Sequence, residues 1–358
     1  MSTSRRTQHL MMAGMWRSLL ATLLVTSAAA RVFEPTLLFN LDLGDMSSAV
    51  TYVPDFNLPP ERASWNTTFS ETPSSYVEGM VGKGSALHNS YMVSKFRFTP
   101  VVGRFNFVGS GFVVRGSVTG DWTPASSDVN PLLPWVCTVN NYVLRLTPPT
   151  NDILVQNSTL PFGYQKIWMA LEFGSWSLGA VTIMTGMVAE ATSIDNVPTR
   201  VESVASKGKI NPFFTHKGKW TVSDHIGGVG GQDRIAYDHA VGSSNTGAEL
   251  SVTLPPRTSY IIINGTTGPT YDKLYINISP APPLNPASFA WVTTRNKWVS
   301  DSIVYAMPLD PRVVYNLSMA PALNSSVALH SITLYSGVGI GKNNATAFDG
   351  FGTVGIVC

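Results

Sequence analysis

Two Asp-His pairs are the residues of this sequence best suited to acid–base or metal chemistry. Asp224-His225 and Asp238-His239 lie fourteen residues apart, around the Gly-rich segment 227–231. Two histidines and two carboxylates can bind zinc, and an Asp can orient a His as a general base. Their spacing matches no standard zinc site and no third strong ligand accompanies them, so we interpret them as surface-loop residues. The sequence predicts no catalytic residue, no metal and no cofactor.

Other chemical motifs are incomplete. The segment Gly337 to Asn343 is similar to a phosphate-binding loop, but it is one residue short and has Asn343 in place of the metal-binding Ser or Thr. No Gly-x-Ser-x-Gly elbow occurs, so a hydrolase nucleophile has no support. Asp42 and Asp45 are predicted to form a turn. A glycan-active enzyme stays open as an alternative, because any two of the 22 acidic residues could meet at the roughly 5–9 Å separation that glycoside hydrolysis needs.

Aromatic residues near predicted loops indicate a different chemistry. Apolar faces of sugar rings pack on exposed aromatic rings, while neighbouring Asp or Asn side chains bind the hydroxyls. Asp121 and Trp122 are the best candidate pair, and Trp298 is a further candidate. A competing interpretation is that such rings fill the core. The rings near predicted loops are Trp65, Trp122, Trp135, Trp220 and Trp298, whereas Trp168 and Trp176 lie within strand patterns and are predicted to be core.

The first thirty residues have the pattern of a secretory signal peptide. Arg5, Arg6 and Arg17 precede or flank an apolar run from Leu19 to Val25, and Ala28 to Ala30 supply small residues for cleavage. The apolar run is too short to span a bilayer stably, and no later segment is long enough. Without the three arginines, 21 Lys and Arg stand against 22 Asp and Glu. This near-neutrality excludes a basic nucleic-acid-binding surface. The signal-peptide pattern predicts a secreted or cell-surface location.

Seven Asn-x-Ser/Thr sequons follow this segment, which predicts a glycoprotein. Strand alternation places two of them, Asn277 and Asn316, opposite the large apolar residues of their strands and therefore toward solvent. All seven asparagines are expected to be accessible. They are Asn66, Asn157, Asn264, Asn277, Asn316, Asn324 and Asn344.

Only two cysteines occur, Cys137 and Cys358. In an oxidising compartment they could form a disulfide, although Cys358 is the last residue of the sequence, where chain ends fray. The sequence leaves both states open. Either way, hydrophobic cores must stabilise the fold.

Short runs rich in Val, Ile, Phe, Tyr and Thr, separated by Gly, Pro, Ser and Asn, predict an all-β protein. The proline-rich breakers at 148–149, 255–256 and 280–283 end neighbouring strands. The predicted strands are Arg104–Val108, Gly111–Val118, Tyr142–Leu146, Gln165–Phe173, Leu178–Met184, Ser259–Ile263, Asp272–Ile278, Asp301–Ala306, Val313–Met319 and Val327–Tyr335.

The second half of the chain repeats the pattern of the first at a spacing of roughly 150 residues, which indicates a duplicated domain. The segment 178–186 aligns with 329–337, 112–120 aligns with 260–268, and Tyr164 aligns with Tyr315. Trp65 and Trp220 precede the two copies of this pattern. We expect a first β-sandwich domain over 31–190, a linker over 191–211, a second domain over 212–337 and a flexible Gly-rich tail over 338–358.

The order of these motifs resembles the galactose-binding-like jelly-roll of fungal-type secreted and cell-surface proteins. The resemblance is carried by Gly-Ser-Gly-Phe-Val-Val-Arg-Gly-Ser at 109–117, Leu-Pro-Phe-Gly-Tyr at 160–164 and the strand that ends at Gly186. The second copy keeps Leu309-Asp310-Pro311-Arg312 with Tyr315. The resemblance implies two tandem jelly-roll domains and says less about activity, because this fold serves lectin, appendage and adhesion domains alike.

These patterns together predict a non-catalytic binding or recognition protein, with carbohydrate or cell-wall glycan as the ligand class. An adhesion ectodomain with a protein partner is the alternative. A loop Trp lying flat on a concave surface would favour sugar, whereas a broad apolar patch without sequons would favour a protein interface.

Overall fold

The computed structural model describes a series of segments that cover most of the predicted strands, namely residues 35–44, 47, 49–53, 65–69, 90–95, 101–119, 135–144, 152–171, 175–188, 198–205, 208–225, 236–244, 247–267, 273–285, 289–293, 299–323 and 325–336. From Pro35 onward the chain forms one compact unit. The predicted signal peptide and the Gly-rich tail lie outside the described residues and remain predictions.

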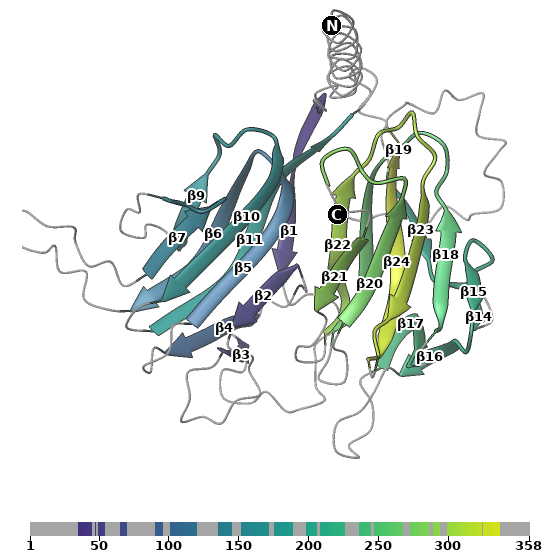
Figure 1. Cartoon of the computed structure of the whole chain (residues 1–358). Helices are drawn as coiled ribbons and strands as arrows, with labels where there is room; N and C mark the ends of the chain where they lie inside the picture. The colour runs from purple at the N-terminus through teal and green to yellow at the C-terminus, as the bar shows by residue number, and fades with distance from the viewer. Residues whose placement is uncertain are drawn as a thin grey trace, which may run out of the picture. The chain divides into compact units, whose positions relative to one another are not determined.

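The described residues form an all-β protein (Figure 1). They include no helix that is both long and apolar enough to cross a membrane. Each of the ten strands predicted from the sequence overlaps an observed strand, although Val313–Tyr315 form a turn ahead of the strand predicted there.

The described residues of the first half form eleven strands. They are β1 Leu37–Gly44, β2 Val50–Val53, β3 Trp65–Phe69, β4 Ser90–Lys95, β5 Val101–Gly109, β6 Gly111–Thr119, β7 Trp135–Val139, β8 Tyr142–Val143, β9 Ile153–Asn157, β10 Gly163–Leu171 and β11 Ser175–Met187.

In the second half, thirteen strands lie within the part of the chain that the structure describes. They are β12 Thr199–Glu202, β13 Val204–Ala205, β14 Lys209–Ile210, β15 Thr215–Lys217, β16 Thr221–His225, β17 Ala236–Ser243, β18 Glu249–Thr253, β19 Thr258–Thr267, β20 Lys273–Ser279, β21 Phe289–Thr293, β22 Val299–Pro308, β23 Asn316–Pro321 and β24 Val327–Ser336.

Each half builds two main sheets with the same strand order. In the first half, sheet A has the order β3-β4-β11-β6-β9 with β1 on β11, and sheet B has the order β2-β5-β10-β7-β8. In the second half, sheet C has the order β16-β17-β24-β19-β22 with β12 on β24, and sheet E has the order β15-β18-β23-β20-β21. The strands β13 and β14 form a small extra hairpin.

This match confirms the strand equivalences predicted from the repeat. The pairs β6 and β19, β10 and β23, and β11 and β24 occupy the same places in their sheets, as the aligned segments required. Among the described strands, every pairing joins two strands of the same half. The duplication is therefore visible in the topology even where the two sequences have diverged.

In each half the two sheets share a hydrophobic core. The first core contains Phe112 and Val181 from sheet A together with Phe105 and Ile167 from sheet B. The second contains Ile261 and Ile332 from sheet C together with Leu250 and Leu317 from sheet E. Alternate residues of the strands point into these cores, as expected for strands that pack on one face.

The two cores also share residues across the halves. Tyr260 and Ile262 of β19 belong to the first core, and Val108 of β5 belongs to the second. The ring of Phe39 lies 5.1 Å from that of Tyr260, edge to face. The Ser259 hydroxyl donates a hydrogen bond to the sulfur of Met187 at 3.3 Å.

The predicted linker over 191–211 is wrong in its C-terminal part. Thr199–Glu202 form β12, which pairs with β24 as β1 pairs with β11. The buried Ser203 extends this connection, because its hydroxyl donates to the carbonyl of Leu329 at 2.6 Å. The charged residues of this segment favoured a linker. In β12, however, the buried Val201 stands between the exposed Arg200 and Glu202, as expected for an edge strand with one side in solvent.

Candidate functional site

The residues predicted to bind a ligand lie outside the described part of the chain. This applies to Asp121, Trp122 and Trp298. Of the Asp-His pairs, only the backbone is described: Asp224 and His225 lie in β16, and Asp238 and His239 lie in β17, which pairs with it. The described residues contain no group of three or more His, Cys, Asp or Glu able to hold a metal ion.

Trp135 was predicted near a loop but is a core residue. It is the first residue of β7 and 0 % exposed, and it packs in the first core. A proline directly before it does not prevent a strand from starting there, since only the ladder hydrogen bond of the proline itself is lost. Trp220 is half-buried: its indole N–H donates to the carbonyl of Lys217 at 3.0 Å and its ring packs against the second core.

Trp168 was predicted to be core but is 41 % exposed. Burial alternates along residues 165–169 of its strand β10, with Gln165, Ile167 and Met169 buried and with Lys166 and Trp168 exposed. The prediction failed because it followed the hydrophobicity of the ring instead of its phase. A charged residue such as Lys166 is expected to point to solvent, and Trp168, two residues further on, lies on the same side of the strand. The position of Lys166 therefore indicated that Trp168 is exposed.

Trp168 lies at the centre of one row of side chains across sheet B. The register pairs Thr51 with Arg104, Arg104 with Trp168, Trp168 with Thr138, and Thr138 with Val143. Directly opposed side chains of neighbouring strands have Cβ atoms about 5 Å apart. Arg104 and Thr138 therefore stand on either side of the indole ring.

A second row completes this surface. Lys166 pairs with Asn106, and both are exposed. The ammonium of Lys166 lies 5.9 Å from the centre of the Tyr164 ring, within cation–π range. We call this surface the Trp168 face; it consists of Thr51, Arg104, Asn106, Thr138, Tyr164, Lys166 and Trp168.

Side-chain hydrogen bonds of the buried Gln165 and of Asn140 hold β10 in the phase that exposes Trp168. The amide nitrogen of Gln165 donates to the carbonyl of Pro161 at 2.6 Å, and its amide oxygen accepts a hydrogen bond from the Asn140 side chain at 2.7 Å. The side-chain oxygen of Asn140 in turn accepts from the backbone N–H of Lys166 at 2.9 Å. The inward side of β10 is thereby fixed by polar as well as apolar contacts.

The Asn140-Asn141 turn makes these contacts possible. Both residues have positive φ, 50° and 73°, between β7 and β8. Two successive positive φ angles are typical of a two-residue type I′ hairpin, in which Asn is a favoured residue. The turn thus aims the Asn140 amide back at β10.

Sheet E carries the counterpart of the Trp168 face, with a different composition. Its outer positions include Ser251, Thr253, Asn277, Asn316 and Ser318, and none of its described outer residues is an exposed Trp. Two sequons interlock here: Asn277 pairs with Ser318, and Ser279 pairs with Asn316. Each sequon asparagine therefore stands opposite the serine of the other sequon.

The sequon asparagines whose side chains are described are all accessible. Asn316 is exposed, and Asn157, Asn264 and Asn277 are half-buried. The alternating burial of β20 and β23 confirms the strand phases predicted for Asn277 and Asn316. The side chain of Asn66 and all of Asn324 and Asn344 lie outside the described residues.

Cys137 is a free, fully buried thiol in the first core. Burial raises its pKa to about 12, because the core disfavours the charged thiolate. Cys358 lies outside the described residues. Cys137 thus serves as a small hydrophobic residue of the core.

Asp42 and Tyr315 have structural roles. Asp42 was expected in a turn but lies in β1, where its carboxylate accepts a hydrogen bond from Thr182 of β11 at 2.6 Å.

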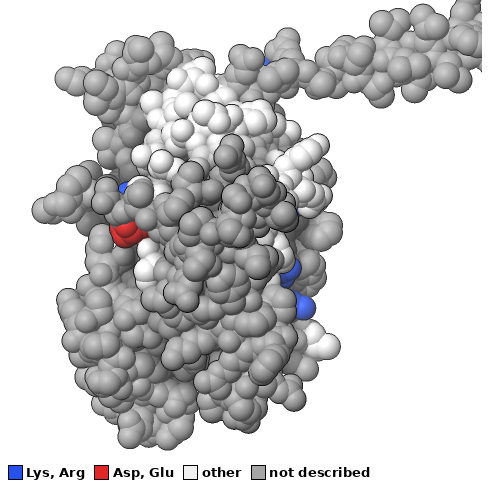
Figure 2. All heavy atoms as spheres, turned by 90° about the vertical axis from the view of Figure 1, so that its left-hand side faces the viewer, with Lys and Arg blue, Asp and Glu red and all other residues white. Residues whose placement is uncertain are grey.

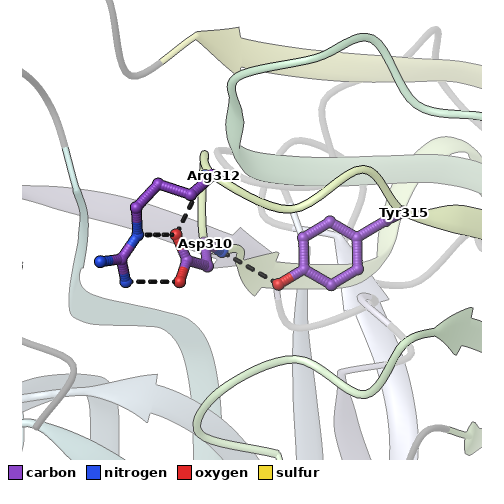
Figure 3. Close-up of polar contacts among 3 residues, drawn as sticks. All are labelled: Asp310, Arg312 and Tyr315. Atoms are coloured by element: carbon purple, nitrogen blue, oxygen red, sulfur yellow. Dashed lines mark hydrogen bonds and ion pairs between the residues drawn. The ribbon is translucent and has the colours of Figure 1, made fainter. Parts of the chain in front are cut away.

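Figure 3 shows the corner before β23: the Tyr315 hydroxyl accepts from the Asp310 backbone N–H at 3.2 Å. Arg312 donates to both carboxylate oxygens of Asp310, at 2.8 and 2.6 Å. Such a tyrosine bond to backbone a few residues upstream braces a sandwich corner.

The described surface carries few charges. In the view of Figure 2, most described atoms belong to uncharged residues, with isolated basic and acidic side chains. The chain has 13 % charged residues, below the roughly 25 % of typical soluble domains. Polar recognition here must depend on a few well-placed groups.

No protein-family model matches the chain, and no curated protein matches its sequence. Among solved structures, the N-terminal CBM22-1–CBM22-2 tandem domain from Paenibacillus barcinonensis Xyn10C is similar over 86 % of this chain and 98 % of that one, with 10 % identity and a TM-score of 0.27. A Paenibacillus xanthan lyase matches 76 % of this chain with 10 % identity and a TM-score of 0.27, but this chain covers only 26 % of the lyase. An exo-beta-1,3-galactanase from Phanerochaete chrysosporium matches 72 % of this chain and 67 % of its own, with 11 % identity and a TM-score of 0.27. Identity and TM-scores this low transfer no ligand or activity to the chain.

Proposed function

We propose that this chain is a non-catalytic carbohydrate-binding protein and that the Trp168 face holds the sugar. The observation that carries the proposal is the exposure of a large apolar ring, 41 %, in the middle of an ordered sheet face. A solvent-facing Trp contributes little to a core, whereas it offers a flat surface on which the apolar face of a pyranose can pack. Asn106, Thr138 and Thr51 surround it with hydrogen-bonding groups for sugar hydroxyls.

The Trp168 face is preorganised for such a ligand. Its side chains extend from paired strands, and the buried bonds of Gln165 and Asn140 fix the strand that carries the ring. Binding therefore requires no ordering of the backbone, which keeps its entropic cost low. Three further residues remain predicted to bind the sugar, namely Asp121, Trp122 and Trp298.

We also propose that each half is a jelly-roll of the galactose-binding-like type. A four-bladed propeller would have four sheets too, but each of its blades is a self-contained sheet of four strands around a central channel. Here successive strands alternate between facing sheets, as in β4, β5, β6 and β7, which lie in sheets A, B, A and B. This alternation supports two sandwiches, with a boundary between Met187 and Thr199.

Substitution of Trp168 tests the binding proposal. We expect Trp168→Ala to weaken the binding of any glycan the native chain binds on a glycan array by about 1–2 kcal/mol, roughly 5- to 30-fold in Kd. Thermal stability should fall only modestly, because Trp168 is 41 % exposed and its ring lies on the outer side of sheet B, outside the core.

Tyr142→Ala is the matched control. Tyr142 is an aromatic residue of the same sheet, 79 % exposed, but it belongs to the edge strand β8 and points away from the Trp168 face. We expect its substitution to leave glycan binding intact. Equal affinity of native protein and Trp168→Ala for every bound glycan would exclude the Trp168 face, and release of sugar from the bound glycan would exclude a non-catalytic role.

We further propose that the chain is a secreted or cell-surface glycoprotein. The signal-peptide pattern of residues 1–30 and the seven sequons support this assignment. The accessibility of Asn157, Asn264, Asn277 and Asn316 is compatible with it, since each can carry a glycan without entering a core.

A further inference from the structure

The charges of the Trp168 face have only one sign. The five strands of sheet B contain Arg104 and Lys166 and no Asp or Glu. Both cations point to the outer side, where they are exposed. A ligand on this face therefore meets two positive charges from the sheet and no negative one.

The two cations flank the ring that would stack on a sugar. Arg104 stands directly opposite Trp168 on the neighbouring strand, and Lys166 precedes Trp168 by two residues on the same side of β10. A pyranose ring packed on the indole would hold its substituents within reach of both side chains, since directly opposed side chains lie about 5 Å apart and residues two apart on one strand about 7 Å.

These groups match the chemistry of an acidic sugar. The planar guanidinium of Arg104 can bind a carboxylate or sulfate through two parallel hydrogen bonds, and the ammonium of Lys166 adds a second charge. The cation–π contact with Tyr164 keeps that ammonium on the face without neutralising it. Neutral sugars can accept hydrogen bonds from both groups but form no ion pair with them.

The equivalent face of the second half differs in this respect. Sheet E has Lys217 opposite Glu249, so one of its cations already faces a carboxylate, and its centre is occupied by small polar residues and two sequons. In sheet E, Trp291 of β21 is in register with the outer residue Tyr275, and its side chain lies outside the described residues. Among the described side chains, the combination of an exposed Trp with two cations and no carboxylate occurs on the face of sheet B.

We infer that the Trp168 face recognises acidic glycans, with Trp168 stacking on the sugar ring and Arg104 and Lys166 binding its carboxylate or sulfate. This inference rests on the proposed function of the same face. It adds the ligand class and assigns roles to two residues that the stacking argument alone does not use.

Paired glycan probes test the inference on the full chain. Oligogalacturonate is compared with its methyl ester, and dextran sulfate with uncharged dextran, by isothermal titration at 50 and 300 mM salt. We expect at least one charged probe to bind roughly 10-fold or more tightly than its neutralised partner, and high salt to weaken only the charged probe. The pair that shows the difference identifies carboxylate or sulfate as the recognised group.

Variants connect the effect to the named residues. Arg104→Gln and Lys166→Gln should each reduce the preference for the charged probe severalfold. Lys273→Gln is the control, because it makes the same change in net charge on the exposed end of β20, away from the Trp168 face, and it should leave the preference unchanged.

Failure of the inference and failure of the proposed function give different results. Equal binding of the charged and neutralised probes, still lost in Trp168→Ala, would overturn the acidic-glycan inference and leave the carbohydrate function standing. Charged-probe binding that survives in Trp168→Ala but disappears in Arg104→Gln would overturn the stacking site. A chain that binds no glycan on an array overturns both.

Discussion

At the scale of single residues, one buried polar side chain determines how the Trp168 face is presented. Gln165 occupies an inward position of β10 and is 2 % exposed, yet hydrogen bonds to Pro161, Gly109 and Asn140 satisfy its amide. A buried amide with all its partners stabilises one register, because any slip by one residue would leave it unpaired. That register is the one that points Trp168 and Lys166 outward.

Cys137 provides a residue-scale test of the first core. With its pKa raised to about 12, only about one thiol in ten thousand is ionised at pH 8, against about one in ten for a thiol with the ordinary pKa of 9.0. We expect alkylation of Cys137 in the folded protein to be at least about a thousandfold slower than in the unfolded chain. Peptide mapping after timed iodoacetamide labelling, with and without guanidinium chloride, measures it.

The same pKa shift gives a pH dependence with a definite sign. The fold holds this thiol neutral, so its contribution to the free energy of unfolding is complete below about pH 9 and is lost as the pH rises toward 12. Cys137→Ala should abolish that part of the alkaline loss of stability. Rapid labelling of Cys137 in the folded state, or an unchanged alkaline profile in Cys137→Ala, would contradict its burial.

The tryptophans show what sequence could and could not predict at this scale. The core prediction for Trp168 is wrong, because the hydrophobicity of the ring was weighed above its strand phase. For Trp135, which has a flanking Pro, the sequence left both a loop position and core packing open, and the ring is core. Period-two alternation with Lys166 contained the correct answer for Trp168. The inward position of Gln165 made the phase hard to recognise, since a buried Gln near an exposed Trp reverses the usual pattern of apolar residues inside and polar residues outside.

At the scale of strands, the interlocked sequons of β20 and β23 define a second surface with its own test. Thr253 donates to the side-chain oxygen of Asn316 at 2.7 Å, which leaves the amide nitrogen, the atom that carries an N-glycan, facing outward. Secretion from a eukaryotic cell should yield glycans here. We expect Asn277→Gln and Asn316→Gln each to remove one glycan mass from the protein, as measured by intact mass spectrometry before and after enzymatic deglycosylation.

A control at another site separates this outcome from a general loss of modification. Asn157 lies in β9 of sheet A, far in sequence from both sequons, and Asn157→Gln should not change the occupancy of Asn277 or Asn316. An unmodified, secreted native protein would contradict the glycoprotein assignment and leave the Trp168 face untouched.

The strands themselves were more predictable than their connections. Alternating β-branched and aromatic runs located the strands, and the repeat located their equivalents. The start of the second half was missed because β12 is short and charged and gains its stability from pairing with β24, 130 residues later. Long-range pairing of this kind leaves no local pattern.

At the scale of the whole molecule, the shared cores predict cooperative unfolding. Tyr260 of the second half packs in the first core against Phe39, and the hydroxyl of Ser259 bonds to Met187. Neither half can unfold without exposing apolar surface of the other. We therefore expect a single thermal transition, with equal hydrogen-exchange protection of β11 and β24 at the level of global unfolding.

Tyr260→Ala sharpens that test. The variant should lower the stability of both halves together, because its ring is 1 % exposed and contacts residues of both. Two separate calorimetric transitions in the native chain, or loss of protection confined to β24 in the variant, would show independent folding instead.

The pairing of β20 with β23 also limits the time during which each of the two sequons can be glycosylated. Enzymes that attach N-glycans act on chain that is still extended, and Asn277 and Asn316 face each other's serines once the two strands have paired. The sequons lie 39 residues apart, so at about 5–20 residues per second a ribosome takes about 2–8 s to travel from one to the other. During that interval β20 has no β23 to pair with, and Asn277 is open to modification until β21 pairs with β20 and places Phe289 beside it. Asn316 leaves the ribosome after its partner strand β20, so its modification must compete with strand pairing. A cell that folds this half quickly will therefore release chains whose glycosylation differs most at Asn316.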